Sequence, residues 1–192
     1  MKILCVDDDN TFLTIYKATL GKILFPEDEL ELLDTGTKVE NLLDKSSFDL
    51  VITDLVMPEV SGLDVLRIVK DKRPQAEVIV VTGQASIDSA VEAMRLGARD
   101  YLTKPINTSM LTEKISNIRE FLLREQEAED YRYAKEAIEE SAIKTVNEME
   151  IKLNNYIELI SSIKDLLTKN DLTDDARSEI LKTISETENN IL

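Results

Sequence analysis

Residues 50–58, Leu-Val-Ile-Thr-Asp-Leu-Val-Met-Pro, decide the fold class of this chain. Their first part, Leu50–Ile52, is continuously apolar instead of alternating between apolar and polar residues, which indicates a strand covered on both faces. A second run of this kind, Val78–Val81, follows after a segment of helical periodicity. Strands that are buried on both faces are typical of a parallel sheet with helices above and below it.

The same alternation of short apolar runs and amphipathic segments extends over residues 1–105. The predicted strands are Ile3–Val6, Leu30–Leu33, Leu50–Thr53, Val78–Val81 and Tyr101–Leu102. Helical periodicity fills the intervals between them, so the pattern is a fivefold βα repeat and predicts an α/β domain. In parallel sheets, ligands bind at the carboxyl ends of the strands, and that edge is where functional residues are expected.

Four predicted strands are followed by polar groups. These groups are Asp7-Asp8-Asp9, Asp54, Thr82-Gly83 and Lys104-Pro105. Each of them alone also suits a helix N-cap, a turn or a surface loop, but their joint occurrence at one sheet edge favours a functional site. Carboxylates that meet there raise one another's proton affinity, and a bound cation relieves the repulsion. Oxygen ligands favour magnesium or calcium, and we expect Mg²⁺ because it commonly shares its ligand shell with a phosphate.

This set of motifs resembles the receiver domain of response regulators in two-component signalling. The motifs are Val6-Asp7-Asp8-Asp9, Asp54-Leu55-Val56-Met57-Pro58 with Gly62, Val81-Thr82-Gly83, Gly97-Ala98 with Asp100-Tyr101-Leu102, and Lys104-Pro105. The resemblance covers about residues 1–122 and implies a flavodoxin-like, five-stranded parallel sheet with helices on both faces. It also implies that a partner histidine kinase or phosphotransfer protein donates a phosphoryl group to an aspartate of this chain.

The resemblance and the chemistry of the side chains together assign the reacting residues. We expect Asp54 to be the nucleophile and the phosphorylated residue. Lys104 would neutralise one phosphate oxygen, and Thr82 would donate a hydroxyl hydrogen bond to another, with Gly83 leaving room beside it. In this family the bond between Lys104 and Pro105 is a cis peptide bond. The chain would thus catalyse its own phosphorylation and dephosphorylation, and no separate output enzyme is visible.

The expected magnesium ligands come from the same motifs. Asp8 is expected to be a direct ligand, Asp7 to act through a bound water, and Asp54 to contribute its carboxylate. The backbone carbonyl of Val56 matches the family's third protein ligand. Asp9 falls outside the acidic pair of the family, and we assign it to helix capping.

Tyr101 stands at the position that the family uses for its switch aromatic. Once Thr82 moves toward an acyl phosphate, Tyr101 would rotate into the space behind it and remodel the neighbouring face. The alternative is an aromatic side chain that only packs at the edge of the sheet.

Two other chemistries that fit a strand-end aspartate are disfavoured. A phosphatase of the haloacid dehalogenase type needs a second acid two residues after its nucleophile, where this chain has Val56. A flavodoxin-like flavin binder needs a phosphate-binding loop after the first strand, where this chain has three carboxylates.

Residues 123–192 are predicted to form a helical extension. No proline or glycine occurs from Asn107 to Lys169, so the last receiver helix is expected to continue to about residue 169. One face of it carries a seven-residue repeat, here called the heptad stripe, made of Val146, Met149, Leu153, Tyr156, Ile160, Ile163 and Leu167. Lys169-Asn170-Asp171 would end the helix, and Thr173 would cap a second helix at about 174–192. This helical hairpin needs a partner for its apolar face, most simply a second copy that completes a four-helix bundle.

The hairpin resembles the dimerisation hairpin of sensor histidine kinases, and Met149-Glu150-Ile151-Lys152 is similar to the segment that carries their phosphoacceptor histidine. The chain contains no histidine, so the hairpin cannot accept a phosphoryl group in that way. A plain coiled-coil dimerisation element is the alternative interpretation. We therefore expect a phosphorylation-controlled adaptor that forms a homodimer; the rival hypothesis is the receiver and dimerisation segment of a larger hybrid kinase or transcription regulator.

Composition restricts the partners and the compartment. The formal net charge is −15, so no basic surface for nucleic acid or anionic lipid is expected. Neither a signal peptide nor a membrane-spanning run is seen in the sequence, and the single cysteine, Cys5, lies in an apolar run. These features predict a cytoplasmic protein with no membrane partner.

Overall fold

The computed structural model describes residues 1–168 and 173–191 of the chain. The chain divides into two compact units, Met1–Arg124 and Glu125–Leu192. In the described part of the chain, no helix combines the length and the apolar character needed to cross a membrane.

The first unit is built on a five-stranded sheet. Its strands are β1 (Lys2–Val6), β2 (Glu29–Leu33), β3 (Leu50–Asp54), β4 (Glu77–Thr82) and β5 (Asp100–Thr103). All neighbouring strands are parallel, and their order is β2-β1-β3-β4-β5. The predicted flavodoxin-like sheet is confirmed. The order reverses between β1 and β3, which is where such sheets bind their ligands.

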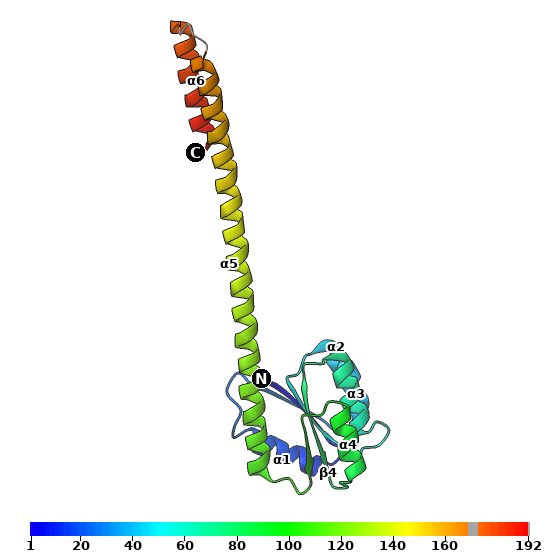
Figure 1. Cartoon of the computed structure of the whole chain (residues 1–192). Helices are drawn as coiled ribbons and strands as arrows, with labels where there is room; N and C mark the ends of the chain where they lie inside the picture. The colour runs from blue at the N-terminus through cyan, green and yellow to red at the C-terminus, as the bar shows by residue number, and fades with distance from the viewer. Residues whose placement is uncertain (169–172, 192) are drawn as a thin grey trace. The chain divides into compact units, whose positions relative to one another are not determined.

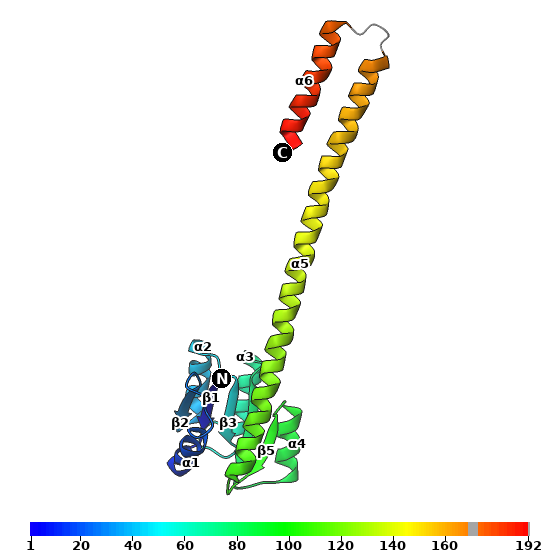
Figure 2. The ribbon, with the colours of Figure 1, turned by 90° about the vertical axis from the view of Figure 1, so that its left-hand side faces the viewer.

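Helices cover both faces of this sheet (Figures 1 and 2). One face is covered by α1 (Asn10–Leu20) and by the first turns of α5 (Thr108–Thr168), and we call it the α1/α5 face. The other face is covered by α2 (Val39–Lys45), which follows the short 3₁₀ helix η1 (Gly36–Lys38), and by α3 (Gly62–Lys72) and α4 (Ile87–Arg95).

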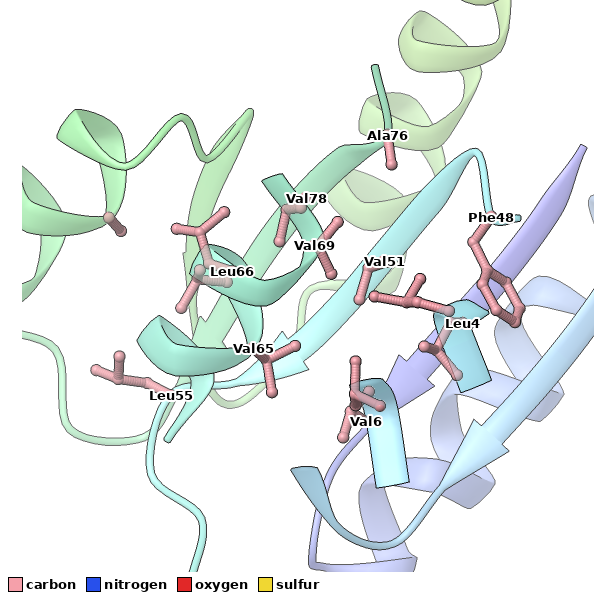
Figure 3. Packing of buried hydrophobic residues seen from close by; sticks show 14 of the residues in the cluster. Leu4, Val6, Phe48, Val51, Leu55, Val65, Leu66, Val69, Ala76 and Val78 are labelled. Atoms are coloured by element: carbon pink, nitrogen blue, oxygen red, sulfur yellow. The ribbon is translucent and has the colours of Figure 1, made fainter. Parts of the chain in front are cut away.

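Two hydrophobic clusters hold these layers together. Figure 3 shows the cluster beneath α2, α3 and α4, where Val65, Leu66 and Val69 of α3 pack against Val51 of β3. Each of these four side chains is fully buried. The strands contribute alternate residues to the two clusters, so both faces of the sheet are apolar. This explains why the central strands β1, β3 and β4 are apolar without alternation.

Strand pairing positions the acidic residues. Val6 of β1 is in register with Thr53 of β3, so the next residues, Asp7 and Asp54, come side by side at the carboxyl edge. Thr82 is the last residue of β4, and its carbonyl oxygen accepts a hydrogen bond from the backbone N–H of Lys104 (2.7 Å). The fold therefore gathers the predicted groups at one edge of the sheet.

The second unit consists of the remainder of α5 and of α6 (Asp174–Ile191). Helix α5 has 61 residues and is continuous across the boundary between the units, as the absence of proline and glycine predicts. Thr173 accepts a hydrogen bond from the backbone N–H of Ala176 (3.4 Å), which fits its predicted capping role. The predicted break at Lys169-Asn170-Asp171 and the side chain of Leu167 lie outside the described residues.

Within this unit, the apolar residues of α5 differ in how far they are exposed. Leu159 and Ile163 are partly buried, as are Ile180 and Ile184 of α6. Most described members of the heptad stripe are instead exposed: Val146, Met149, Leu153, Tyr156 and Ile160 expose between 45% and 64% of their surface. The hairpin thus leaves an apolar face on α5 uncovered in a single chain.

Candidate functional site

Three carboxylates form an acidic cluster at the carboxyl edge of the sheet. Asp7, Asp8 and Asp54 each offer a carboxylate oxygen, and these oxygens lie within 4.8 Å of one another. Asp7 is fully buried and Asp54 is 7% exposed, whereas Asp8 is exposed. The cluster therefore has a buried floor and an open side, through which a reactant can approach.

Lys104 connects the two buried members of the acidic cluster. Its ammonium nitrogen lies 2.9 Å from Oδ2 of Asp7 and 3.0 Å from Oδ2 of Asp54. The backbone N–H of Asp9 donates a further hydrogen bond to Oδ1 of Asp7 (3.1 Å). Burial raises the pKa of Asp7, and the hydrogen bond from Lys104 opposes this shift. Lys104 therefore supplies the positive charge that offsets part of the cost of burying these carboxylates.

The acidic cluster has the donor set and the charge for a divalent cation. Oδ1 of Asp54 is buried and has no hydrogen-bond partner among the described residues. Three carboxylates face the single ammonium group of Lys104, which leaves an excess of negative charge. Carboxylate oxygens are preferred ligands of Mg²⁺. A buried oxygen without a hydrogen-bond partner is free to coordinate a metal ion.

Val56 was predicted to be a metal ligand through its backbone carbonyl, and Asp9 was predicted to cap a helix instead. Val56 follows Asp54 by two positions and exposes 48% of its surface, so its side chain is not committed to the core. Asp9 precedes α1, and its carboxylate accepts a hydrogen bond from the backbone N–H of Thr11 (2.8 Å). Hydrogen bonds from the side chain and from the backbone of Thr11 lower the pKa of Asp9. Asp9 is the N-cap of α1, as the sequence predicts.

Thr82 ends β4 at the same edge of the sheet. It is fully buried, and its hydroxyl oxygen accepts a hydrogen bond from the backbone N–H of Gln84 (3.0 Å). Because that bond uses only a lone pair, the hydroxyl hydrogen stays available for another acceptor. A Cβ on Gly83 would meet no atom within 4 Å, so the space beside Thr82 is open. The peptide bond between Lys104 and Pro105 is cis, as the family resemblance implies.

Tyr101 joins β5 to the beginning of α4. Its ring packs against the cluster beneath α2, α3 and α4, and its hydroxyl lies 2.8 Å from Oγ of Ser89. Ser89 in turn forms the capping box of α4 with Ser86. The hydroxyl of the predicted switch residue is therefore tied to the N-terminal turn of a neighbouring helix.

Three further features lie close to the site. The ring centroid of Phe12 lies 3.7 Å from the ammonium nitrogen of Lys104, a cation–π contact between residues 92 positions apart. A Cβ on Gly62 would lie 2.0 Å from the carbonyl oxygen of Asp54, so α3 begins in direct contact with the end of β3. Glu59, in the loop between them, has a positive φ of 64°.

Comparison with known proteins agrees with this geometry. The family model described as "Response regulator receiver domain" matches residues 3–116. Response regulator protein PilR of Pseudomonas aeruginosa is 34% identical over 134 residues, which are 67% of this chain and 28% of PilR. Chemotaxis protein CheY of the same organism is 36% identical over 120 residues, which are 62% of this chain and 95% of CheY. The chain thus spans less than a third of PilR and nearly the whole of CheY.

Solved structures show the same architecture. A response regulator receiver domain protein from Clostridium thermocellum is 36% identical, with a TM-score of 0.57, over 64% of this chain and 98% of that one. The BeF3-activated receiver domain of DrrB is 30% identical, with a TM-score of 0.56, over 62% of this chain and 97% of that one. The family match covers more than half of the chain, and the fold and acidic edge agree with it. The chain therefore belongs to the response regulator receiver domain family.

Proposed function

We propose that this chain accepts a phosphoryl group on Asp54 from the phosphohistidine of a partner histidine kinase or phosphotransfer protein. An oxygen of Asp54 forms the new bond to phosphorus as the bond from phosphorus to the histidine nitrogen breaks, and that nitrogen keeps the electron pair. The observation that carries the proposal is the bridge from Lys104 to Asp7 and Asp54 beside an open side at Asp8.

The residues of the site divide the work of this transfer. Lys104 moves from the carboxylates to a phosphoryl oxygen, and Thr82 donates its free hydroxyl hydrogen to another. Asp7, Asp8, Asp54 and the carbonyl of Val56 would hold Mg²⁺, which neutralises negative charge between the carboxylates and the incoming phosphoryl group when bound. Because these groups all belong to the chain, a small phosphodonor should serve as well as a protein.

The test is labelling with a small phosphodonor such as acetyl phosphate in the presence of Mg²⁺. We expect one acid-stable, base-labile label per chain by mass spectrometry, and none in Asp54→Asn, which keeps the shape of the side chain but removes the anionic nucleophile. Asp71→Asn makes the same change on the exposed side of α3 and should label like the unaltered chain. Full labelling of Asp54→Asn would refute the assignment.

We further propose that the second unit forms a homodimer and that the chain is an adaptor acting in the cytoplasm. The exposed apolar face of the heptad stripe supports the dimer, because a continuous stripe on one helix face is typical of a helical bundle. The buried free thiol of Cys5 suits a reducing compartment. A receiver and dimerisation segment of a larger regulator is the second candidate, favoured by the 28% coverage of PilR.

A further inference from the structure

Tyr16 of α1 packs next to the acidic cluster on the α1/α5 face of the sheet. It is fully buried, in the same hydrophobic cluster as Cys5 of β1 and Ile52 of β3. Asp7 comes two residues after Cys5, and Asp54 two residues after Ile52. Because alternate residues of a strand point to the same face, the two carboxylates continue the rows of side chains that Tyr16 contacts.

The hydroxyl group of Tyr16 is buried and makes no hydrogen bond of standard distance and angle with the residues that the structure describes. Buried hydroxyl groups normally have a hydrogen-bond partner, because moving a hydroxyl group from water into the protein interior without one costs free energy. Burial raises the pKa of Tyr16, and Asp7, Cys5 and Asp54 raise it further, Asp7 also as an acceptor for the phenol, so the phenol keeps its hydrogen and faces Asp7. The phenol donor thus lies near Asp7 without making a hydrogen bond of standard geometry to it.

The proposed phosphorylation would free the Asp7 carboxylate to accept a well-formed hydrogen bond from this donor. In the structure, the carboxylate of Asp7 is held by Lys104 at 2.9 Å and by the backbone N–H of Asp9 at 3.1 Å. When Lys104 moves to a phosphoryl oxygen, Asp7 loses its ammonium partner while staying fully buried. A buried carboxylate that loses a charged partner needs another donor on its buried side.

We propose that Tyr16 is a positioning residue of the acidic cluster, whose buried hydroxyl donates a hydrogen bond to Asp7 when Lys104 leaves that carboxylate for the phosphoryl group. This inference rests on the proposed function, because the move of Lys104 belongs to it. The new hydrogen bond replaces a lost one on Asp7 and keeps its carboxylate turned toward the cation. Groups that orient a metal ligand in this way contribute to metal affinity without touching the metal.

The test compares the full-length chain with Tyr16→Phe, which removes one oxygen atom and keeps the ring. Thermal unfolding is followed without Mg²⁺, over a Mg²⁺ titration, and over the same titration with beryllofluoride as a stable mimic of the phosphoryl group. Tyr131→Phe is the matched control, because Tyr131 is 73% exposed in the second unit and loses the same hydroxyl group.

We expect Tyr16→Phe to be at least as stable as the unaltered chain without Mg²⁺, because a buried hydroxyl without a well-formed hydrogen bond is gone. With beryllofluoride, we expect its melting temperature to rise less, and the Mg²⁺ concentration for half of that rise to increase about tenfold. Tyr131→Phe should follow the unaltered chain throughout.

Two results would overturn the inference alone. One is an equal rise with beryllofluoride in Tyr16→Phe and in the unaltered chain. The other is a loss of stability in Tyr16→Phe that is the same in all three conditions, which would mean that the hydroxyl only supports packing. If the unaltered chain itself gains no stability from Mg²⁺ and beryllofluoride, the proposed function fails, and the inference fails with it.

Discussion

Single residues of the acidic edge differ in how far their roles follow from the sequence. Asp7, Asp8 and Asp54 could be predicted to meet, because each lies at the end of a strand and parallel strands end at one edge. Neighbouring positions in a chain can nevertheless have different environments. Asp8 faces the open side of the cluster, whereas Asp9 caps α1 through Thr11.

These different environments predict different consequences of removing each carboxylate. Asp8→Ala removes an expected direct ligand and should weaken Mg²⁺ binding by at least about tenfold, with little loss of stability. Asp9→Ala removes a helix cap and should lower the melting temperature slightly while leaving Mg²⁺ binding intact. A Mg²⁺ titration followed by NMR chemical shifts measures both affinities. Equal losses in the two variants would show that the metal assignment is displaced by one residue.

The contacts of Phe12 and Tyr16 could not be predicted in the same way. Both residues lie on α1 in an amphipathic pattern, and that pattern only assigns them to the buried side of a helix. Whether a buried side chain meets an apolar neighbour, Lys104 or the acidic cluster depends on residues far away in the sequence. Periodicity predicts burial, but it does not identify the partner.

At the scale of elements, the strands were the most predictable part of the fold. All five predicted runs are confirmed as strands. The signal is clearest in β3 and β4, which are buried along their whole length, whereas β2 and β5 are only partly buried. The ion pairs between elements that are distant in the sequence could not be predicted. Asp28, just before β2, binds the guanidinium group of Arg119 in α5 through both carboxylate oxygens (3.1 and 2.7 Å). The N-terminal ammonium group of Met1 also contacts Asp28, at 2.6 Å.

This ion pair makes stability depend on pH in a predictable direction. Arg119, with the N-terminal ammonium group, holds the pKa of Asp28 well below its ordinary value of 3.8. A carboxylate whose pKa is lower in the folded state stabilises the fold above its ordinary pKa, and that contribution is lost as the pH falls toward the lowered pKa. At pH 7, Asp28→Asn leaves buried cations without their counter-charge and should reduce the free energy of unfolding by about 3 kcal/mol.

Urea unfolding between pH 7 and pH 2.5 measures this effect. The difference in the free energy of unfolding between the unaltered chain and Asp28→Asn should be constant above pH 5. It should shrink below about pH 4, as Asp28 takes up a proton. Asp34→Asn is the control, because Asp34 pairs with Lys38 at an exposed site and should change stability by less than about 1 kcal/mol. A difference that does not depend on pH would mean that the variant disturbs packing rather than charge.

At the scale of the whole molecule, the chain combines a receiver unit with a helical unit that exposes an apolar stripe. The continuity of α5 could be predicted from the absence of helix-breaking residues. The partner of the stripe could not, because a seven-residue repeat shows that a helix needs an apolar neighbour without identifying it. Five described side chains of the stripe are exposed in a single chain, which is consistent with the proposed dimer.

The dimer predicts a clear outcome for a charge placed in the stripe. Light scattering should find the unaltered chain dimeric at micromolar concentration without phosphorylation, and Asp54→Asn should be dimeric as well. Ile160→Asp should be monomeric, because an aspartate in a buried seam has no partner. Ile151→Asp should stay dimeric, because Ile151 lies on the opposite side of α5 from the stripe and is 61% exposed. A monomeric unaltered chain would refute the dimer.

The close approach between α3 and β3 has a consequence for reading natural variation in this chain. At position 62, the carbonyl oxygen of Asp54 occupies the place that any β-carbon would need. Every amino acid other than glycine must therefore displace the backbone of Asp54, the proposed phosphoacceptor. In a saturation survey, position 62 would be as intolerant as the acidic residues, although it contributes no atom to the chemistry. Loss of function on substitution of Gly62 would therefore reflect steric fit alone and not a chemical role of this residue.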